Sequence, residues 1–263
     1  MLVLIRGAGD IASGIAVRLK RSGFDVIMTE IKEPLAIRRT VAFCEAVRLK
    51  GETVKVEGFE AKLAKDESEA LKLMCTGVIP VLVDPELKCL DEIKPEILVD
   101  AILAKKNLGT KKSFADIVIG IGPGFTAGED CHAVIESMRC HTLGRAYYEG
   151  TTIPNTAVPG LIGGFAGERV MRAPCDGVFE STLSIGDVVK AGDTVGYVDG
   201  QPMKASIDGI IRGLIADGTP VTSGLKSGDV DPRADATYCT LVSDKALAIG
   251  GGVLEAIMHF GGQ

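Results

Sequence analysis

The sequence places two cysteine-histidine pairs close together, in the stretch GEDCHAVIESMRCHTLGR. They are Cys131-His132 and Cys140-His141, and they hold two of the seven cysteines and two of the three histidines. Zinc is the first chemistry to consider, because thiolate and imidazole are its preferred ligands. Neighbouring residues of a strand point to opposite faces, however, and this spacing matches no common zinc pattern. We therefore predict no stable metal site.

A reactive thiol is the second chemistry that the pairs could support. Cys131 follows a glycine-containing loop, and His132 and His141 could lower the pKa of its thiol. Glu129 and Asp130 act in the other direction, because nearby negative charge raises a thiol pKa. We assign the candidate catalytic roles to Cys131, His132 and His141, and ordinary packing is the alternative use of both pairs.

The first thirty residues predict a strand, a glycine turn, a helix and a second strand. An apolar run ends in Gly7-Ala8-Gly9, and apolar residues at helical spacing follow. The second strand closes with Glu30, 21 residues after Gly9, where dinucleotide-binding folds keep the acid that holds the ribose. Asp10 departs from this pattern, since a carboxylate at a helix N-terminus repels a pyrophosphate. The candidate cofactor-binding residues here are Gly7, Gly9, Asp10, Ala12 and Glu30, for NAD(P) or another nucleotide; the alternative is a tight turn that binds no cofactor.

Three further apolar runs, at 78–83, 97–103 and 117–121, are rich in valine and isoleucine. Continuous runs of this kind suit strands that are covered on both faces, so we predict a Rossmann-like, doubly wound parallel sheet over residues 1–150. Gly122 and Gly124 leave the last run as Gly7 and Gly9 leave the first. Both glycine turns should meet at the carboxyl edge of the sheet, with the Cys131-His132 pair at its margin.

The second half repeats itself at a constant offset of 32 residues, with Asp176-Gly177 matching Asp208-Gly209 and no gap needed. Short alternating strands and glycine turns predict a small all-β domain with pseudo-twofold symmetry over 170–243, after a connecting segment at 151–169. The pattern resembles the biotinyl/lipoyl-type barrel-sandwich hybrid, whose hairpin carries a modified lysine. The matching residue is Lys204 in DGQPMKAS, but the residues around it differ from the carrier motif, so we predict an unmodified barrel.

The last residues, 244–263, predict a helix that packs back on the first domain, which makes the barrel an insertion. Before it, Asp229, Asp231 and Arg233 could bind a cation or form a turn locked by an Asp-Arg pair, and we favour the turn.

Composition excludes several classes of protein. The net charge of −6 and the absence of a long basic block argue against a nucleic-acid partner. The apolar run at the N-terminus is too short for a signal peptide, and no stretch approaches the roughly 20 apolar residues of a membrane span. Seven irregularly spaced cysteines favour reduced thiols. We expect a cytoplasmic protein without membrane partners, and the sequence leaves homo-oligomerisation open.

Motifs spread over the whole chain add a resemblance to a known family. They are GAGDIASG, GPGFTAGEDCHAVIE followed by LGR, RAPCDGVF, GLKSGDVDPR and SDKALAIGGGVLEA. Together they resemble the selenium-dependent molybdenum hydroxylase accessory family (YqeB type). The resemblance implies a cytoplasmic protein that helps to mature the molybdenum-selenium centre of such hydroxylases, with the hydroxylase or its maturation proteins as partners. At Cys140 the family pattern leads us to expect glycine, so this residue departs from it.

The leading hypothesis is therefore an accessory factor that binds a ligand at the carboxyl edge. In this hypothesis Cys131 handles a sulfur or selenium species, because a thiolate can accept either as a persulfide-type adduct. Two alternatives stay open: an NAD(P)-dependent oxidoreductase, and a non-enzymatic scaffold or biotin/lipoyl-type carrier.

Overall fold

The structure is a computed structural model that describes residues 1–156, 158 and 160–261. Its contacts divide the chain into two compact units. Unit 1 contains 1–34, 42–156 and the segment from Val242 onward. Unit 2 contains 35–41 and 157–241. Unit 2 is thus formed by two segments that interrupt unit 1.

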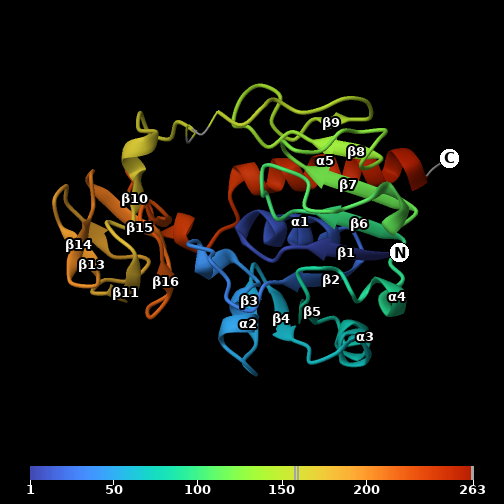
Figure 1. Cartoon of the computed structure of the whole chain (residues 1–263), viewed down its shortest axis with the longest axis horizontal. Coiled ribbons are helices and arrows are strands. Elements are labelled where there is room, and N and C mark those ends of the chain that lie inside the picture. The colour runs from blue at the N-terminus through green and yellow to red at the C-terminus, as the bar shows by residue number, and fades with distance from the viewer. Residues whose placement is uncertain (157, 159, 262–263) are drawn as a thin grey trace. The chain divides into compact units, whose positions relative to one another are not determined.

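Unit 1 is built on one sheet, in which the described residues form nine strands in the order β3-β4-β5-β2-β1-β6-β7-β8-β9. The strands are β1 (Leu2–Arg6), β2 (Asp25–Glu30), β3 (Val54–Val56), β4 (Phe59–Leu63), β5 (Ile79–Val83), β6 (Ile97–Asp100), β7 (Ile117–Ile121), β8 (Ala133–Ile135) and β9 (Ala146–Tyr147). The helices are α1 (Asp10–Arg21), α2 (Glu45–Arg48), α3 (Glu67–Cys75), α4 (Leu90–Ile93) and α5 (Asp244–Gly261), with short 3₁₀ turns elsewhere. β1 lies in the middle between β2 and β6, and all five of its residues are apolar or buried (Figure 1).

Helix α5 belongs to unit 1 and packs against α1 (Figure 1). Small residues make this contact close: a Cβ on Gly14 of α1 would lie 2.5 Å from the Cβ of Ala246. On α5, a Cβ on Gly250 would lie 3.0 Å from the Cβ of Arg18. Gly14 and Gly250 therefore allow the two helices to approach each other.

The predicted fold class is wrong for unit 1. The sheet is mixed, because β3 pairs antiparallel with β4 at one edge and β8 pairs antiparallel with β9 at the other. Within the described residues, β6 and β7 are joined by a segment whose single helical element is the 3₁₀ turn Lys112–Phe114, and no helix lies between β7 and β9. A doubly wound fold needs helical crossovers on both faces. The glycine- and lysine-rich segments after β6 and β7 have no helical periodicity to supply them.

In unit 2 the described residues form two four-stranded antiparallel sheets, ordered β10-β17-β15-β12 and β14-β13-β11-β16. The strands are β10 (Val170–Arg172), β11 (Gly177–Ser181), β12 (Val188–Val189), β13 (Thr194–Val198), β14 (Gln201–Lys204), β15 (Gly209–Leu214), β16 (Pro220–Val221) and β17 (Lys226–Asp231). Phe179, Val195, Ile211 and Val230 lie in the core and are fully buried. The segment 35–41 adds to this unit, since the amide of Leu214 donates to the carbonyl of Ile37.

Hydrogen bonds confirm the internal repeat. The amide of Gly186 donates to Ile211, and the amide of Gly218, 32 residues later, donates to Phe179, which is 32 residues before Ile211. The carboxylates behave in the same way. Asp176 accepts the amide of Ser223, and Asp208 accepts the amide of Ala191. Each half therefore caps the turns of the other half.

The predicted barrel-sandwich hybrid is nevertheless wrong as a fold class. The unit contains two separate open sheets, and β10 and the segment 35–41 add to it from outside the repeat. Lys204 pairs with Thr194 at the far end of the β13–β14 hairpin, whose tip is Asp199-Gly200. A single bulge between Thr194 and Gly196 shifts the pairing by one residue at this end of the hairpin.

The Asp-Arg turn predicted at the end of the repeat is confirmed. Asp231 accepts the Arg233 guanidinium at 2.6 Å and also the buried Arg212 at 3.0 Å. Burial by itself would raise the pKa of Asp231, but hydrogen bonds from Arg233 and the two guanidinium charges together lower it. These carboxylates are thus used for structure.

None of the helices in the described part of the chain is both long enough and apolar enough to cross a membrane.

Candidate functional site

The carboxyl ends of the central strands bring the two glycine turns to one edge of the sheet. β1 is parallel to β2 and β6, and β6 is parallel to β7, so their last residues lie side by side. Pairing continues into the turns: the amide of Gly7 donates to Thr29, and the amide of Gly122 donates to Ile135. We call the turns 7–10, 101–106 and 122–124 the carboxyl-edge site. Its position follows from parallel pairing, as predicted.

Glycines allow these turns to pack backbone against backbone. Gly7 has φ +99°, and a Cβ there would lie 3.2 Å from the carbonyl oxygen of Ala101. Gly124 has φ +107°, and a Cβ there would lie 2.4 Å from the Cα of Lys106. A Cβ on Gly122 would lie 2.4 Å from the hydroxyl of Ser137. The glycines are therefore required by close contact as well as by conformation.

A buried arginine holds the edge together. Arg6, at the end of β1, donates to Asp100 at 3.1 Å and to the hydroxyl of Thr110 at 3.0 Å. It also donates to the carbonyl oxygens of Pro85 and Leu108. One guanidinium thus fixes the segments that follow β5 and β6, and its hydrogen bonds compensate for its burial. This explains a charged residue at a position where the strand pattern predicts an apolar one.

Glu30 holds the first glycine turn. One of its oxygens accepts the amide of Ala8 at 3.0 Å, and the other accepts the amide of Ile31 at 2.8 Å. Burial raises the pKa of Glu30, and these two hydrogen bonds act against the rise. Both carboxylate oxygens are therefore engaged with the backbone, although the sequence motif predicts that this residue contacts a ribose.

Helix α1 begins at Asp10, and its N-cap Gly9 has an extended conformation without a side-chain cap. Ala12 is buried under this turn. The amide of Cys44 donates to the carbonyl oxygen of Ala8, so the segment before α2 lies against the turn. No sequence motif points to Cys44. Its thiol is fully buried, and burial and the charge of Glu30 raise its pKa well above the ordinary value.

The turn 101–106 of the carboxyl-edge site carries positive charge. Residues 101–115 contain four lysines and no acidic residue, in a chain of net charge −6. Lys105 and Lys106 are exposed, and the described residues supply neither with an ion pair. Leu103 and Lys105 have positive φ, so the backbone here is held in an unusual conformation. The sequence shows the paired lysines, but their place at this edge depends on the fold.

Cys131 and His132 lie elsewhere. They precede β8, and the backbone of His132 pairs with Val118, near the start of β7. Gly122 follows the other end of that strand, so the pair is not at the carboxyl edge where we expected it. The direction of β8 explains the difference: its carboxyl end is Ile135, beyond the pair.

Both side chains of this pair are engaged. The Cys131 thiol is fully buried in a hydrophobic cluster, and burial raises its pKa to about 12. His132 accepts the amide of Val118 through Nδ1 at 2.9 Å, and its ring meets Phe260 edge to face. Burial and the charge of Lys112 lower the pKa of His132. This environment disfavours a thiolate at Cys131 and a charged imidazole at His132.

Thiol labelling tests this description. Iodoacetamide at pH 8 should modify the exposed Cys75 and Cys140 in the folded protein and leave Cys131 and Cys89 unmodified, since burial raises the pKa of both buried thiols. The thiolate fraction at Cys131 should be lower than that of a free thiol by a factor on the order of 1,000. Peptide mass mapping over time measures the rates, and the same reaction in urea is the control. Modification of Cys131 as fast as Cys140 would contradict the buried position.

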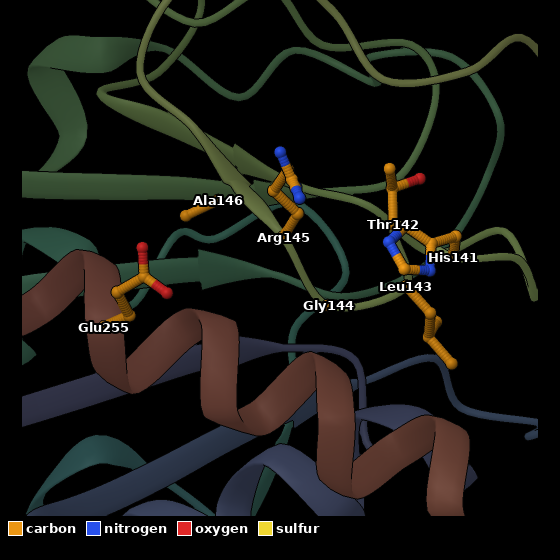
Figure 2. A pocket seen from close by; sticks show the side chains of 7 residues that line it. All are labelled: His141, Thr142, Leu143, Gly144, Arg145, Ala146 and Glu255. Carbon is orange, nitrogen blue, oxygen red and sulfur yellow. The ribbon is translucent and has the colours of Figure 1, made fainter.

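His141 belongs to a different place, a surface hollow of about 550 Å³ between one turn and α5. Figure 2 shows its lining, in which His141, Thr142 and Arg145 project from the turn and Glu255 stands on α5. The structure therefore does not bring His141 together with Cys131 and His132. In the described residues, no group of three or more histidines, cysteines or carboxylates could hold a metal ion.

No protein-family model matches the chain. The sequence is 54% identical over 257 residues to the "Uncharacterized protein YqeB" of Escherichia coli (strain K12). The match covers 98% of this chain and 47% of that protein, so the chain spans about half the length of the curated relative it matches.

Among solved structures, the chain is similar to an aspartoacylase family protein from Mesorhizobium loti (12% identity, 87% of this chain, 84% of that chain, TM-score 0.29). It is also similar to the ectoine utilization protein EutE (DoeB) of Ruegeria pomeroyi (12% identity, 87% and 84% of the two chains, TM-score 0.25). At such low TM-scores these similarities assign no activity. The sequence identity relates the chain to YqeB of E. coli over about half the length of that protein.

Proposed function

We propose that this protein is an accessory factor in the maturation of selenium-dependent molybdenum hydroxylases, and that it binds a nucleotide or a similar phosphate-bearing ligand at the carboxyl-edge site. The identity to YqeB supports the family part of the proposal. In this proposal the molybdenum-selenium centre is the cargo, and the partner is the hydroxylase or another maturation protein.

One observation carries the ligand part. Three turns meet at the carboxyl edge, and one of them presents Lys105 and Lys106 without an ion pair among the described residues. Exposed cations without a protein counter-ion are available to phosphate oxygens. The glycines at 7, 122 and 124 let the segments of the edge pack closely on one another, and Gly124 packs directly against the backbone of Lys106, so the lysine turn is held at the edge.

The other residues of the edge limit how the ligand binds. Asp10 places a carboxylate at the start of α1, which opposes a phosphate at the free amides there. We therefore assign the phosphate to the lysine turn, while Arg6 and Glu30 hold the turns in place. We do not extend the proposal to hydride transfer, because the Glu30 carboxylate is engaged with the backbone. We do not extend it to sulfur transfer at Cys131 either, because that thiol is buried.

Neutralising the lysine turn tests the proposal. The double variant Lys105→Gln/Lys106→Gln should weaken ADP binding by about tenfold at low ionic strength, because each of the two exposed ion pairs that it removes contributes up to about 1 kcal/mol. Titration calorimetry in 20–200 mM salt measures the effect, which should shrink as salt screens the charges. Lys65→Gln/Lys72→Gln removes the same charge from exposed positions of unit 1 and is the matched control.

The functional part needs the native host. The same double variant should lower the activity and the selenium content of the partner hydroxylase, while the control variant restores both in a deletion strain. If ADP binds equally well to both variants, the lysine turn is not the ligand site. If the hydroxylase matures fully in the deletion strain, the maturation role is wrong.

A further inference from the structure

The hollow beside α5 contains cationic and polar groups that the proposed function does not use. It is lined by His141, Thr142, Leu143, Gly144, Arg145, Ala146 and Glu255, none of which belongs to the carboxyl-edge site. All seven lie in unit 1. A volume of about 550 Å³ is large enough for a small phosphorylated molecule.

The floor of the hollow is held rigidly by glycine contacts. Gly144 has φ +80°, and a Cβ there would lie 2.5 Å from the carbonyl oxygen of Ala248 on α5. From the helix side, a Cβ on Gly252 would lie 2.0 Å from the carbonyl oxygen of Gly144. The amide of Gly144 donates to Glu136, and the carbonyl of Arg145 accepts the amide of Glu136. The turn is thus fixed to both α5 and the end of β8, so the side chains it carries start from defined positions.

The lining carries one guanidinium, Arg145, and one carboxylate, Glu255, and the two differ in their partners. Arg145 is exposed, and within the described part of the chain its guanidinium has neither an ion pair nor a hydrogen bond. Glu255, the one carboxylate of the lining, accepts the hydroxyl of Tyr148 at 3.2 Å. Tyr148 in turn stacks on His259 at 4.1 Å between ring centroids. Glu255 is therefore held by its own neighbours, whereas Arg145 is left with five donors.

Three kinds of donor project from the same turn, and the Thr142 hydroxyl also lies 3.1 Å from the Cys140 thiol, a pair in which either atom can donate. Figure 2 shows Arg145, Thr142 and His141 on it, with Glu255 apart from them on α5. A guanidinium, a hydroxyl and an imidazole differ in direction and reach, which suits the oxygens of a tetrahedral oxyanion better than the two coplanar oxygens of a carboxylate. We propose that this hollow binds the phosphate group of a small molecule, with Arg145 as its main contact and Thr142 and His141 as further donors.

The experiment uses the full chain with inorganic phosphate and glycerol 3-phosphate as probes and acetate as the carboxylate arm. Amide NMR titration should shift signals of 141–146, with tighter binding of both phosphates than of acetate. Arg145→Gln should weaken phosphate binding by about fivefold at low ionic strength, the upper range for an exposed ion pair. Arg139→Gln is the matched control and should bind as the wild type does, because Arg139 already pairs with Asp244 through both of its terminal nitrogens.

Three results would overturn the assignment. Phosphate binding that survives Arg145→Gln unchanged removes Arg145 as the contact. Acetate binding as tight as phosphate binding shows that the hollow takes any anion. Shifts confined to 7–10, 101–106 and 122–124 place the phosphate at the carboxyl edge instead, a result that favours the proposed function and rejects this second site. If phosphate still shifts the amide signals of 141–146 in the Lys105→Gln/Lys106→Gln protein, the hollow binds phosphate independently of the carboxyl-edge site, and the two proposals are tested separately.

Discussion

Replacing Gly252 with alanine should destabilise unit 1 by about 3 kcal/mol or more, the upper range for forcing an extra methyl group into a packed site. The new Cβ would lie 2.0 Å from the carbonyl oxygen of Gly144 and 2.9 Å from a methyl group of Ile135. Neither contact is made by the end of a flexible side chain, and the turn at Gly144 has a positive φ of its own. The clash can therefore be relieved only if α5 and the turn move apart, which breaks the close contact between Gly252 and Gly144.

Gly251 supplies the matched control in the same helix. A Cβ there would meet nothing within 4 Å, so Gly251→Ala should be neutral or stabilise the protein by up to about 1 kcal/mol through helix propensity. The chain has no tryptophan, so urea unfolding is followed by circular dichroism, and hydrogen exchange locates the change on α5 and residues 141–147. Equal stability of the two variants would contradict the packing. Because the turn lines the hollow, Gly252→Ala should also weaken phosphate binding there.

The sequence predicts where strands and turns occur better than how they are connected. The apolar runs that begin at Val3, Ile97 and Ile117 are strands, and parallel pairing brings the turns at Gly7 and Gly122 to one edge, as expected. Those inferences depend on local periodicity and on backbone conformation, which adjacent residues determine. The antiparallel pairs at the two edges of the sheet involve the segments 54–63 and 146–147, which contain no long apolar run and so were not predicted as strands, and the predicted fold class failed there.

The candidate site divides in the same way. Gly124 and Glu30 could be placed at the carboxyl edge from the sequence, because Glu30 ends one recognisable strand and Gly124 lies in the turn after another. Cys131 could not be placed in this way. Its distance from the carboxyl edge depends on the direction in which β8 runs beside β7, and the apolar residues 133–135 are compatible with either direction. The Arg6–Asp100 ion pair could not be predicted from the sequence either, because its two residues are 94 positions apart. Only the pairing of β1 with β6 brings them together.

Removing the Asp229 carboxylate should have the largest effect in unit 2. Its side chain is 2% exposed and accepts hydrogen bonds from two buried arginines, Arg169 at 2.6 Å and Arg212 at 2.9 Å. Asp229→Ala leaves both guanidinium groups buried with one partner fewer, and breaking a buried pair from one side costs about 3–5 kcal/mol. The expected result is unfolding of unit 2 at lower urea concentration, with faster hydrogen exchange in β10, β15 and β17, the strands that carry or adjoin these residues.

Lys190→Ala is the control for Asp229→Ala. The Lys190–Asp208 pair of the same unit is exposed on both sides, so its loss should change the stability by less than about 1 kcal/mol.

Acid unfolding offers an independent measurement on the same network of buried carboxylates and arginines. The folded pKa of Asp231 is lowered by its arginines, so the stability it contributes is complete above its unfolded pKa of about 3.9 and is lost as the pH falls through the lower folded value. Unit 2 of the wild type should therefore lose stability below about pH 4, and Asp231→Asn should lose much of that dependence. A wild type whose unit 2 keeps its full stability at pH 2, or an Asp229→Ala protein as stable as Lys190→Ala, would show that the buried arginines do not need these carboxylates.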